Sequence, residues 1–264
     1  MNKEKILAGI DAGHIRTKAV LVRGDEVLGY ASAATAFDAA EAAEIALSQA
    51  LAAARVSRGE LSGLVVTGIF KDVVKVPELA IEKTIPEYMA DAKGALFLNK
   101  NSRTVIDLGG NVHKAVHYDK NGNLLDVIQN DKCADGLGIY YTTIAKTLGV
   151  SEEELSELAL KSKKSVAVAI QCGLCAESEA IDLMCQGVDI ADAADAALRF
   201  IAERVASMAS TMPLEPEVVV AGGLAKSKAL MKHLPVLLKH DVSVLSLPEY
   251  AGAIGAAISY EGGK

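Results

Sequence analysis

The chain has 264 residues, of which 51% are hydrophobic and 23% are charged, and its formal net charge is −7 at pH 7. This composition excludes an extended disordered chain and leaves room for one large domain or two small ones. The acidic balance, the absence of Trp and the 4% of aromatic residues argue against a nucleic-acid partner, which needs a basic face or stacking platforms.

Membrane segments are not expected, because no apolar run reaches the 18 or so residues that a spanning helix needs. The first apolar run meets Asp11 within a few residues, which is too short for a signal peptide. We therefore expect a cytoplasmic protein without a membrane partner. Its four cysteines are then expected to be thiols or metal ligands rather than disulfides.

The first part of the chain predicts three strands joined by tight turns. The apolar run Ile6–Ile10 leads into the turn Asp11-Ala12-Gly13, and a second strand ends at Arg23-Gly24-Asp25, before a third. An Ala-rich segment at 38–55 has a helical period, and Val65–Gly68 reads as a buried strand.

The second part begins in the same way, with an apolar run at 104–106, a Gly-rich turn, a second strand, and an Asn-Gly turn at 121–122. Ser151 is expected to cap a helix, with Glu154 completing a capping box. The expected later elements are helices at 137–148, 152–162, 174–186, 190–211, 225–239 and 251–260, and a strand at 218–221.

These two parts are copies of each other. Residues 11–20 read DAGHIRTKAV and residues 107–116 read DLGGNVHKAV, so that Asp, Gly, Lys, Ala and Val coincide in register. A single Asp-x-Gly is usually an ordinary turn, but two in register after buried strands indicate a duplication. We expect an α/β protein of two halves, 1–98 and 99–264, whose last helix packs back on the first half, with a cleft between them.

The turns suit a phosphate site, because glycines let backbone N–H groups approach an anion. Gly13 serves the first turn, and Gly109, Gly110 and Asn111 serve the second. Asp11 and Asp107 would face each other across the cleft and organise Mg²⁺ and its waters. Lys18 and Lys114 either neutralise phosphate charge or are simply solvated. The expected ATP/ADP site is completed by His14 and by the turn Gly222-Gly223-Leu224, which would lie beneath the adenosine.

Two cysteines occur directly before predicted helices, Cys133 in NDKCADGLG and Cys172 in QCGLCAESEA. A helix N-terminus stabilises a thiolate, which suits an iron ligand, although a lone Cys is more often a small buried residue. Cys172 and Cys175 also form a CxxC, but without the second CxxC of a zinc site. Cys175 is expected one turn inside its helix, facing the core, and Cys185 too far along it to share a cluster. Two chains would then supply four thiolates at a two-fold axis.

The segments NDKCADGLG, CxxCAESEAI and VVVAGGLAK, in that order, resemble the activator ATPases of 2-hydroxyacyl-CoA dehydratases and the ATPase subunits of benzoyl-CoA reductase. The resemblance covers nearly the whole chain. It implies a duplicated actin-like (acetate kinase/Hsp70/actin) fold in a homodimer or pseudo-symmetric heterodimer, with a [4Fe–4S] cluster held by Cys133 and Cys172 of each subunit. It also implies ATP-driven electron transfer from ferredoxin or flavodoxin to a CoA-thioester dehydratase or reductase.

The first turn departs from the family pattern, since Gly13-His14-Ile15 replaces Gly-Ser-Thr and leaves Thr17 as the nearest hydroxyl. The second reads Gly110-Asn111-Val112 in place of Gly-Gln-Asp. Two alternatives therefore remain: a degenerate subunit that pairs with an active ATPase, and a small-molecule kinase of the same fold.

Overall fold

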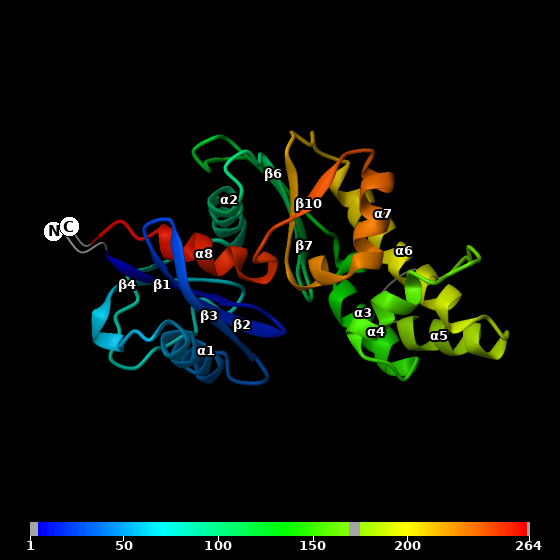
Figure 1. Cartoon of the computed structure of the whole chain (residues 1–264), viewed down its shortest axis with the longest axis horizontal. Coiled ribbons are helices and arrows are strands. Elements are labelled where there is room, and N and C mark those ends of the chain that lie inside the picture. The colour runs from blue at the N-terminus through cyan, green and yellow to red at the C-terminus, as the bar shows by residue number, and fades with distance from the viewer. Residues whose placement is uncertain (1–4, 169–174, 263–264) are drawn as a thin grey trace.

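The computed structural model describes residues 5–168 and 175–262. Within these residues the chain forms two five-stranded sheets, each covered by helices on both faces (Figure 1). No helix in the described part of the chain is long and apolar enough to cross a membrane.

The first sheet has the strand order β3-β2-β1-β4-β5. β1 to β3 form an antiparallel meander, and β4 pairs in parallel with β1. Alternate side chains serve opposite faces, as the pleat requires: Leu21 packs with helix α1, whereas Val20 and Val22 pack with helix α8. The strands are β1 (Ile6–Ala12), β2 (Arg16–Arg23), β3 (Glu26–Ala34), β4 (Leu61–Thr67) and β5 (Lys83–Thr84).

The second sheet, with the order β10-β9-β6-β7-β8, repeats this topology. β6 to β8 form the antiparallel meander and β9 pairs in parallel with β6. The duplicated α/β architecture predicted from the sequence repeat is therefore confirmed. The strands are β6 (Thr104–Leu108), β7 (His113–Tyr118), β8 (Leu124–Gln129), β9 (Val218–Ala221) and β10 (Val242–Val244).

The predicted helices are present with small changes at their ends. The capping box before α4 is confirmed, since the Ser151 hydroxyl accepts from the Glu154 N–H at 3.2 Å. Residues 223–226 form a 3-10 turn, so α7 begins at Lys228 rather than at 225. The helices are α1 (Ala39–Ala54), α2 (Glu87–Leu98), α3 (Leu137–Thr147), α4 (Glu152–Ala159), α5 (Ala176–Cys185), α6 (Ile190–Ala209), α7 (Lys228–Leu238) and α8 (Ala251–Ile258).

Helix α2, which the sequence analysis did not predict, lies between the two sheets and crosses α8 (Figure 1). Glycines make the crossing close: a Cβ on Gly94 would lie 1.8 Å from the Ala251 carbonyl oxygen, and one on Gly255 would lie 1.8 Å from that of Ala90. α2 shares a core with the second sheet and α8 with the first. One face of each sheet is thus covered by a helix from the other predicted half of the chain. A domain boundary at residue 98 stays a prediction.

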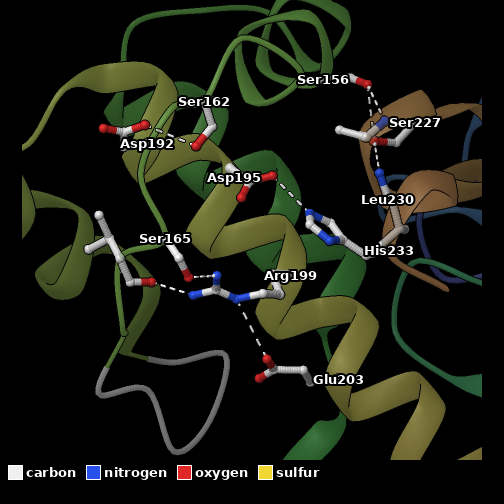
Figure 2. Close-up of polar contacts among 12 residues, drawn as sticks. Ser156, Ser162, Ser165, Asp192, Asp195, Arg199, Glu203, Ser227, Leu230 and His233 are labelled. Carbon is white, nitrogen blue, oxygen red and sulfur yellow. Dashed lines mark hydrogen bonds and ion pairs between the residues drawn. The ribbon is translucent and has the colours of Figure 1, made fainter. Parts of the chain in front are cut away.

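Helix α6 anchors the helical part of the second half (Figure 2). Near its start, Asp192 accepts hydrogen bonds from Ser162 and from the N–H groups of residues 163 and 164, at 2.8–3.0 Å. Asp195 lies 2.8 Å from His233 of α7, and Arg199 donates to Ser165 and to the carbonyl of residue 166. These polar contacts hold the segment after α4, and helix α7, against α6.

Candidate functional site

A cavity of about 500 Å³ lies between the two halves, where the turns of both sheets meet. The end of β1 contributes Asp11 and Gly13, and the end of β6 contributes Asp107. The predicted residues that line this cavity are Asp11, Gly13, His14, Lys18, Asp107, Gly109, Gly110, Asn111, Lys114, Gly222, Gly223 and Leu224. Three turns that are far apart in the sequence are therefore brought to one cavity.

Thr17 does not line the cavity. Its side chain is fully buried, and its hydroxyl lies 3.0 Å from that of Thr35. The Thr35 hydroxyl in turn donates to the Gly13 carbonyl oxygen at 2.8 Å. Thr17 thus supports the first turn from behind rather than presenting a hydroxyl to the cavity.

Each turn carries the same ion pair, because the strand register is the same in both copies. Asp11 is paired with Lys18 across β1 and β2, and Asp107 with Lys114 across β6 and β7. The Lys18 Nζ lies 2.9 Å from Asp11, and the Lys114 Nζ lies 2.8 Å from Asp107. The side chain of Lys114 is only 4% exposed, so the interpretation of Lys114 as a solvated strand-end lysine is wrong.

Two acidic residues that sequence reasoning missed, Glu87 and Asp91, enter the cavity from α2. Lys114 lies 3.7 Å from Glu87 and 3.3 Å from Asp91. The Asp91 Oδ2 is buried and makes no hydrogen bond within the described part of the chain, so its contact with Lys114 is electrostatic only. Acidic residues four apart, just after Pro86, were the available signal, since they share one face of a helix.

Burial and charge oppose each other in this cluster. Burial, the largest single effect, would raise the pKa of Asp107, but the attraction and hydrogen bond of Lys114 together with the charge of Lys18 hold that pKa below its usual value. The pKa of Lys114 is well above its usual value, because Asp107, Asp91 and Glu87 together exceed the effect of burial. Burial dominates at Asp91 and raises its pKa well above normal, with Lys114 opposing it only in part. The cluster thus combines an aspartate whose pKa is lowered with one whose pKa is raised.

The backbone of the second turn is closely packed. A Cβ on Gly109 would lie 2.6 Å from the Val112 carbonyl oxygen. Gly222, with φ of +87°, lies so close to β6 that a Cβ would come 2.3 Å from the Leu108 carbonyl oxygen. Gly223 has open space around it. Glycine at these positions therefore lets the second and third turns approach each other while leaving a backbone surface free.

Polar residues near the starts of helices α4 and α7 line another part of the cavity. Ser227 caps α7, accepting from the Leu230 N–H at 3.3 Å, and its hydroxyl lies 3.2 Å from that of Ser156 in α4 (Figure 2). Glu152 lines the same region, and its carboxylate accepts from Thr142 at 2.6 Å. The sequence predicted the cap of α4 but not the Ser227 cap of α7, nor that both helices start at one cavity.

The tips of the two turns touch each other across the mouth of the cavity. The His14 Nε2 lies 3.5 Å from the Asn111 Nδ2, and its ring packs edge-on to Phe70 at 5.7 Å. The Ile15 side chain covers Gly110, where a Cβ would lie 2.3 Å from the Ile15 Cγ1. The residues that depart from the family pattern at the first turn therefore make the cross-cavity contacts.

The cysteines lie in the helical part of the second half. Cys133 is in the short 3-10 turn Lys132–Ala134 ahead of α3, and Cys172 lies outside the described residues. Cys175 is the exposed N-cap residue of α5, so the expectation that it lies one turn inside the helix and faces the core is wrong. Within the described ranges, no group of three or more His, Cys, Asp or Glu side chains could hold a metal ion.

Two equivalent sheets with a cavity between their turns, glycines at the strand ends and paired carboxylates define the duplicated actin-like ATPase fold. The chain belongs to the BadF/BadG/BcrA/BcrD ATPase family, which matches residues 8–259.

Individual relatives agree with this assignment. The chain is 31% identical to the activator of lactoyl-CoA dehydratase of Anaerotignum propionicum, over 96% of both chains. It is 29% identical to one of the benzoyl-CoA reductase subunits of Thauera aromatica, over 63% of this chain and 61% of that one. The structure of the activator of 2-hydroxyisocaproyl-CoA dehydratase from Clostridium difficile with bound ADPNP superposes with a TM-score of 0.89 at 27% identity, covering 96% and 93% of the two chains. A ROK family glucokinase from Streptomyces griseus, at 15% identity, a TM-score of 0.57 and coverage of 96% and 98%, shares only the fold.

Proposed function

We propose that the chain binds Mg-ATP in the cavity between its halves and hydrolyses it. The observation that carries this proposal is the pair of equivalent turns lining one cavity, each with a glycine and an aspartate that is ion-paired to a lysine. Glycine turns suit phosphates, because a residue without a Cβ lets backbone N–H groups approach an anion closely. Among the residues that the structure describes, no group of three or more His, Cys, Asp or Glu side chains could hold a metal ion. This is compatible with Mg²⁺, which is usually held by phosphate oxygens and water with one or two carboxylates.

In this proposal the two aspartates play similar roles on opposite sides of the phosphates. Asp107 is ionised at neutral pH because of Lys114, so it can accept hydrogen bonds from metal-bound or attacking water. Asp11 has the equivalent position in the first half. The lysines hold the carboxylates in place through their ion pairs, and Gly222, Gly223 and Leu224 form the surface beneath the adenosine.

We further propose that ATP turnover drives an electron to a partner that acts on a CoA thioester. The relatives support this by name, being an activator of a CoA-ester dehydratase and a subunit of a CoA-ester reductase. A [4Fe–4S] cluster would supply a one-electron carrier of low potential. Cys133 and Cys172 of two subunits would hold it, and ferredoxin or flavodoxin would donate the electron.

Iron content and mass in solution test the cluster proposal. Protein purified without oxygen should carry about two irons per chain and be a dimer, since four thiolates are shared between two chains. Cys133→Ser and Cys172→Ser should each lose the iron, whereas Cys175→Ser, the matched control, should keep it. Four irons per monomer, or iron loss in Cys175→Ser alone, would contradict the shared site.

A second candidate is a degenerate subunit that binds nucleotide without hydrolysing it. The observation that favours it is the tip of the first turn, where His14 and Ile15 contact the second turn without offering a hydroxyl. Nucleotide binding without phosphate release, in protein that carries iron, would select this candidate.

A further inference from the structure

The second turn of the cavity is also the N-terminal cap of helix α3. The N-cap residue of α3 is Gly136, and no side chain among the residues that the structure describes caps this helix. Instead, the Ile139 N–H donates to the Gly110 carbonyl oxygen at 3.1 Å, and the Gly136 N–H donates to that of Asn111 at 2.8 Å. The first N–H groups of a helix need an external acceptor, and here the turn supplies it. A shift of the turn therefore displaces acceptors on which the start of α3 depends.

The segment that carries Cys133 is tied to the same turn at both ends. At its start, the Asn130 side chain accepts from the His113 N–H at 2.6 Å, and the Asn130 N–H donates to the His113 carbonyl oxygen at 3.1 Å. At its end, Gly136 is bound to Asn111. Residues 130–136 thus form a short loop whose two anchors lie just two residues apart, at 111 and 113.

Gly110 is packed on both sides. A Cβ on Gly138 of α3 would lie 2.6 Å from the Gly110 Cα, so the helix backbone rests directly on the turn. Ile15, from the other half of the molecule, covers Gly110 as well, with its Cγ1 2.3 Å from where a Gly110 Cβ would be. Such contacts transmit displacement, because close-packed atoms cannot absorb it by compression.

We propose that Ile15 and Gly138 are positioning residues that couple the nucleotide state of the cavity to the Cys133 segment by way of Gly110. This rests on the proposed function, because nucleotide is what would move the two halves. When the halves close on the phosphates, Ile15 presses on Gly110, and the start of α3 and residues 130–136 move with it. The coupling needs an apolar side chain at position 15, which in this chain takes the place of a phosphate-binding hydroxyl.

Hydrogen exchange with and without Mg-ADPNP tests this coupling, using the full-length protein at saturating nucleotide. In the wild type, the amides of Gly136 and Ile139 should exchange about tenfold more slowly with nucleotide, since turn closure fixes their acceptors. In Ile15→Ala this difference should fall below about threefold. Ile45→Ala is the matched control, because Ile45 is 40% exposed and Ile15 is 48% exposed, and it should behave as wild type.

Gly138→Ala should raise the exchange of the same amides even without nucleotide, since the new Cβ pushes α3 off the turn. If Gly138→Ala does not fold, the comparison of Ile15→Ala with the wild type still tests the proposal, because Ile15 is exposed. An unchanged nucleotide effect in Ile15→Ala would overturn the proposal, as would protection of Gly222–Lys226 in the wild type without any change in α3. Absence of nucleotide protection throughout the wild type would instead contradict the nucleotide site itself, and the coupling with it.

Discussion

Replacing His113 by Leu should remove part of the acid sensitivity of this protein. His113 is fully buried on β7, and neither ring nitrogen has a hydrogen-bond partner among the described residues. Burial lowers its pKa to about 4, with Asp107 opposing this shift and Lys114 adding to it. The ring lies on the strand face of Ala115, which packs in the apolar core beneath α3 and α6. Leu is therefore compatible with the site.

The sign follows from the two pKa values. The unfolded chain, with a histidine pKa of about 6.5, binds more protons than the folded one between pH 6.5 and 4, so the free energy of unfolding falls as the pH falls through that window. Between pH 7 and pH 5 His113 should cost about 2 kcal/mol of stability. At pH 7 the substitution should be nearly neutral, since it also removes two unsatisfied polar atoms.

Urea unfolding at pH 7 and pH 5 measures this difference. His113→Leu should lose about 2 kcal/mol less than the wild type on going to pH 5. His240→Leu, at an exposed position, is the control and should keep the wild-type loss. An equal pH dependence in wild type and His113→Leu would show that His113 is not held neutral, and would refute the reasoning.

Other parts of the structure give independent expectations. Gly255→Ala should lower the free energy of unfolding, measured in urea, by about 1–3 kcal/mol, because its Cβ would lie 1.8 Å from the Ala90 carbonyl oxygen. The control Gly59→Ala, whose Cβ would have nothing within 4 Å, should leave it unchanged. Equal effects of the two variants would contradict the packing of α2 on α8. Lys114→Met should lower the free energy of unfolding by about 3–5 kcal/mol at pH 8, because it leaves buried carboxylates unpaired. The loss should be smaller at pH 5.5, since the raised pKa of Asp91 favours protonation of that carboxylate as the pH falls. A melting temperature unchanged from the wild type at both pH values would contradict this.

The repeat let the sequence predict more of the fold than any single element could. Each aspartate-lysine pair lies seven residues apart along the chain, and that spacing places the two residues opposite each other in a hairpin with a short turn. The duplication, the strands that lead into the turns and the capping box of α4 could all be predicted, because they depend on local spacing.

Helix α2 could not be predicted in this way. Its buried residues are mainly Ala and Gly, and they contact two different partners, so it lacks the single apolar stripe of an ordinary surface helix. Missing α2 also meant missing Glu87 and Asp91. The position of Cys175 at the N-cap of α5, rather than inside it, depends on a helix start that no capping side chain marks. Contacts across the cavity, such as Ile15 on Gly110, arise only once both halves are assembled.

Phosphate release from Mg-ATP, measured on protein purified without oxygen, tests the central claim most directly. The wild type and Asp126→Asn, a control at an exposed position of β8, should hydrolyse ATP only with Mg²⁺. Asp11→Asn and Asp107→Asn should each lower the rate by about 100-fold or more, since each removes a charge that organises the metal and its waters. Unchanged hydrolysis in both cavity variants would show that the paired turns are not the ATPase site.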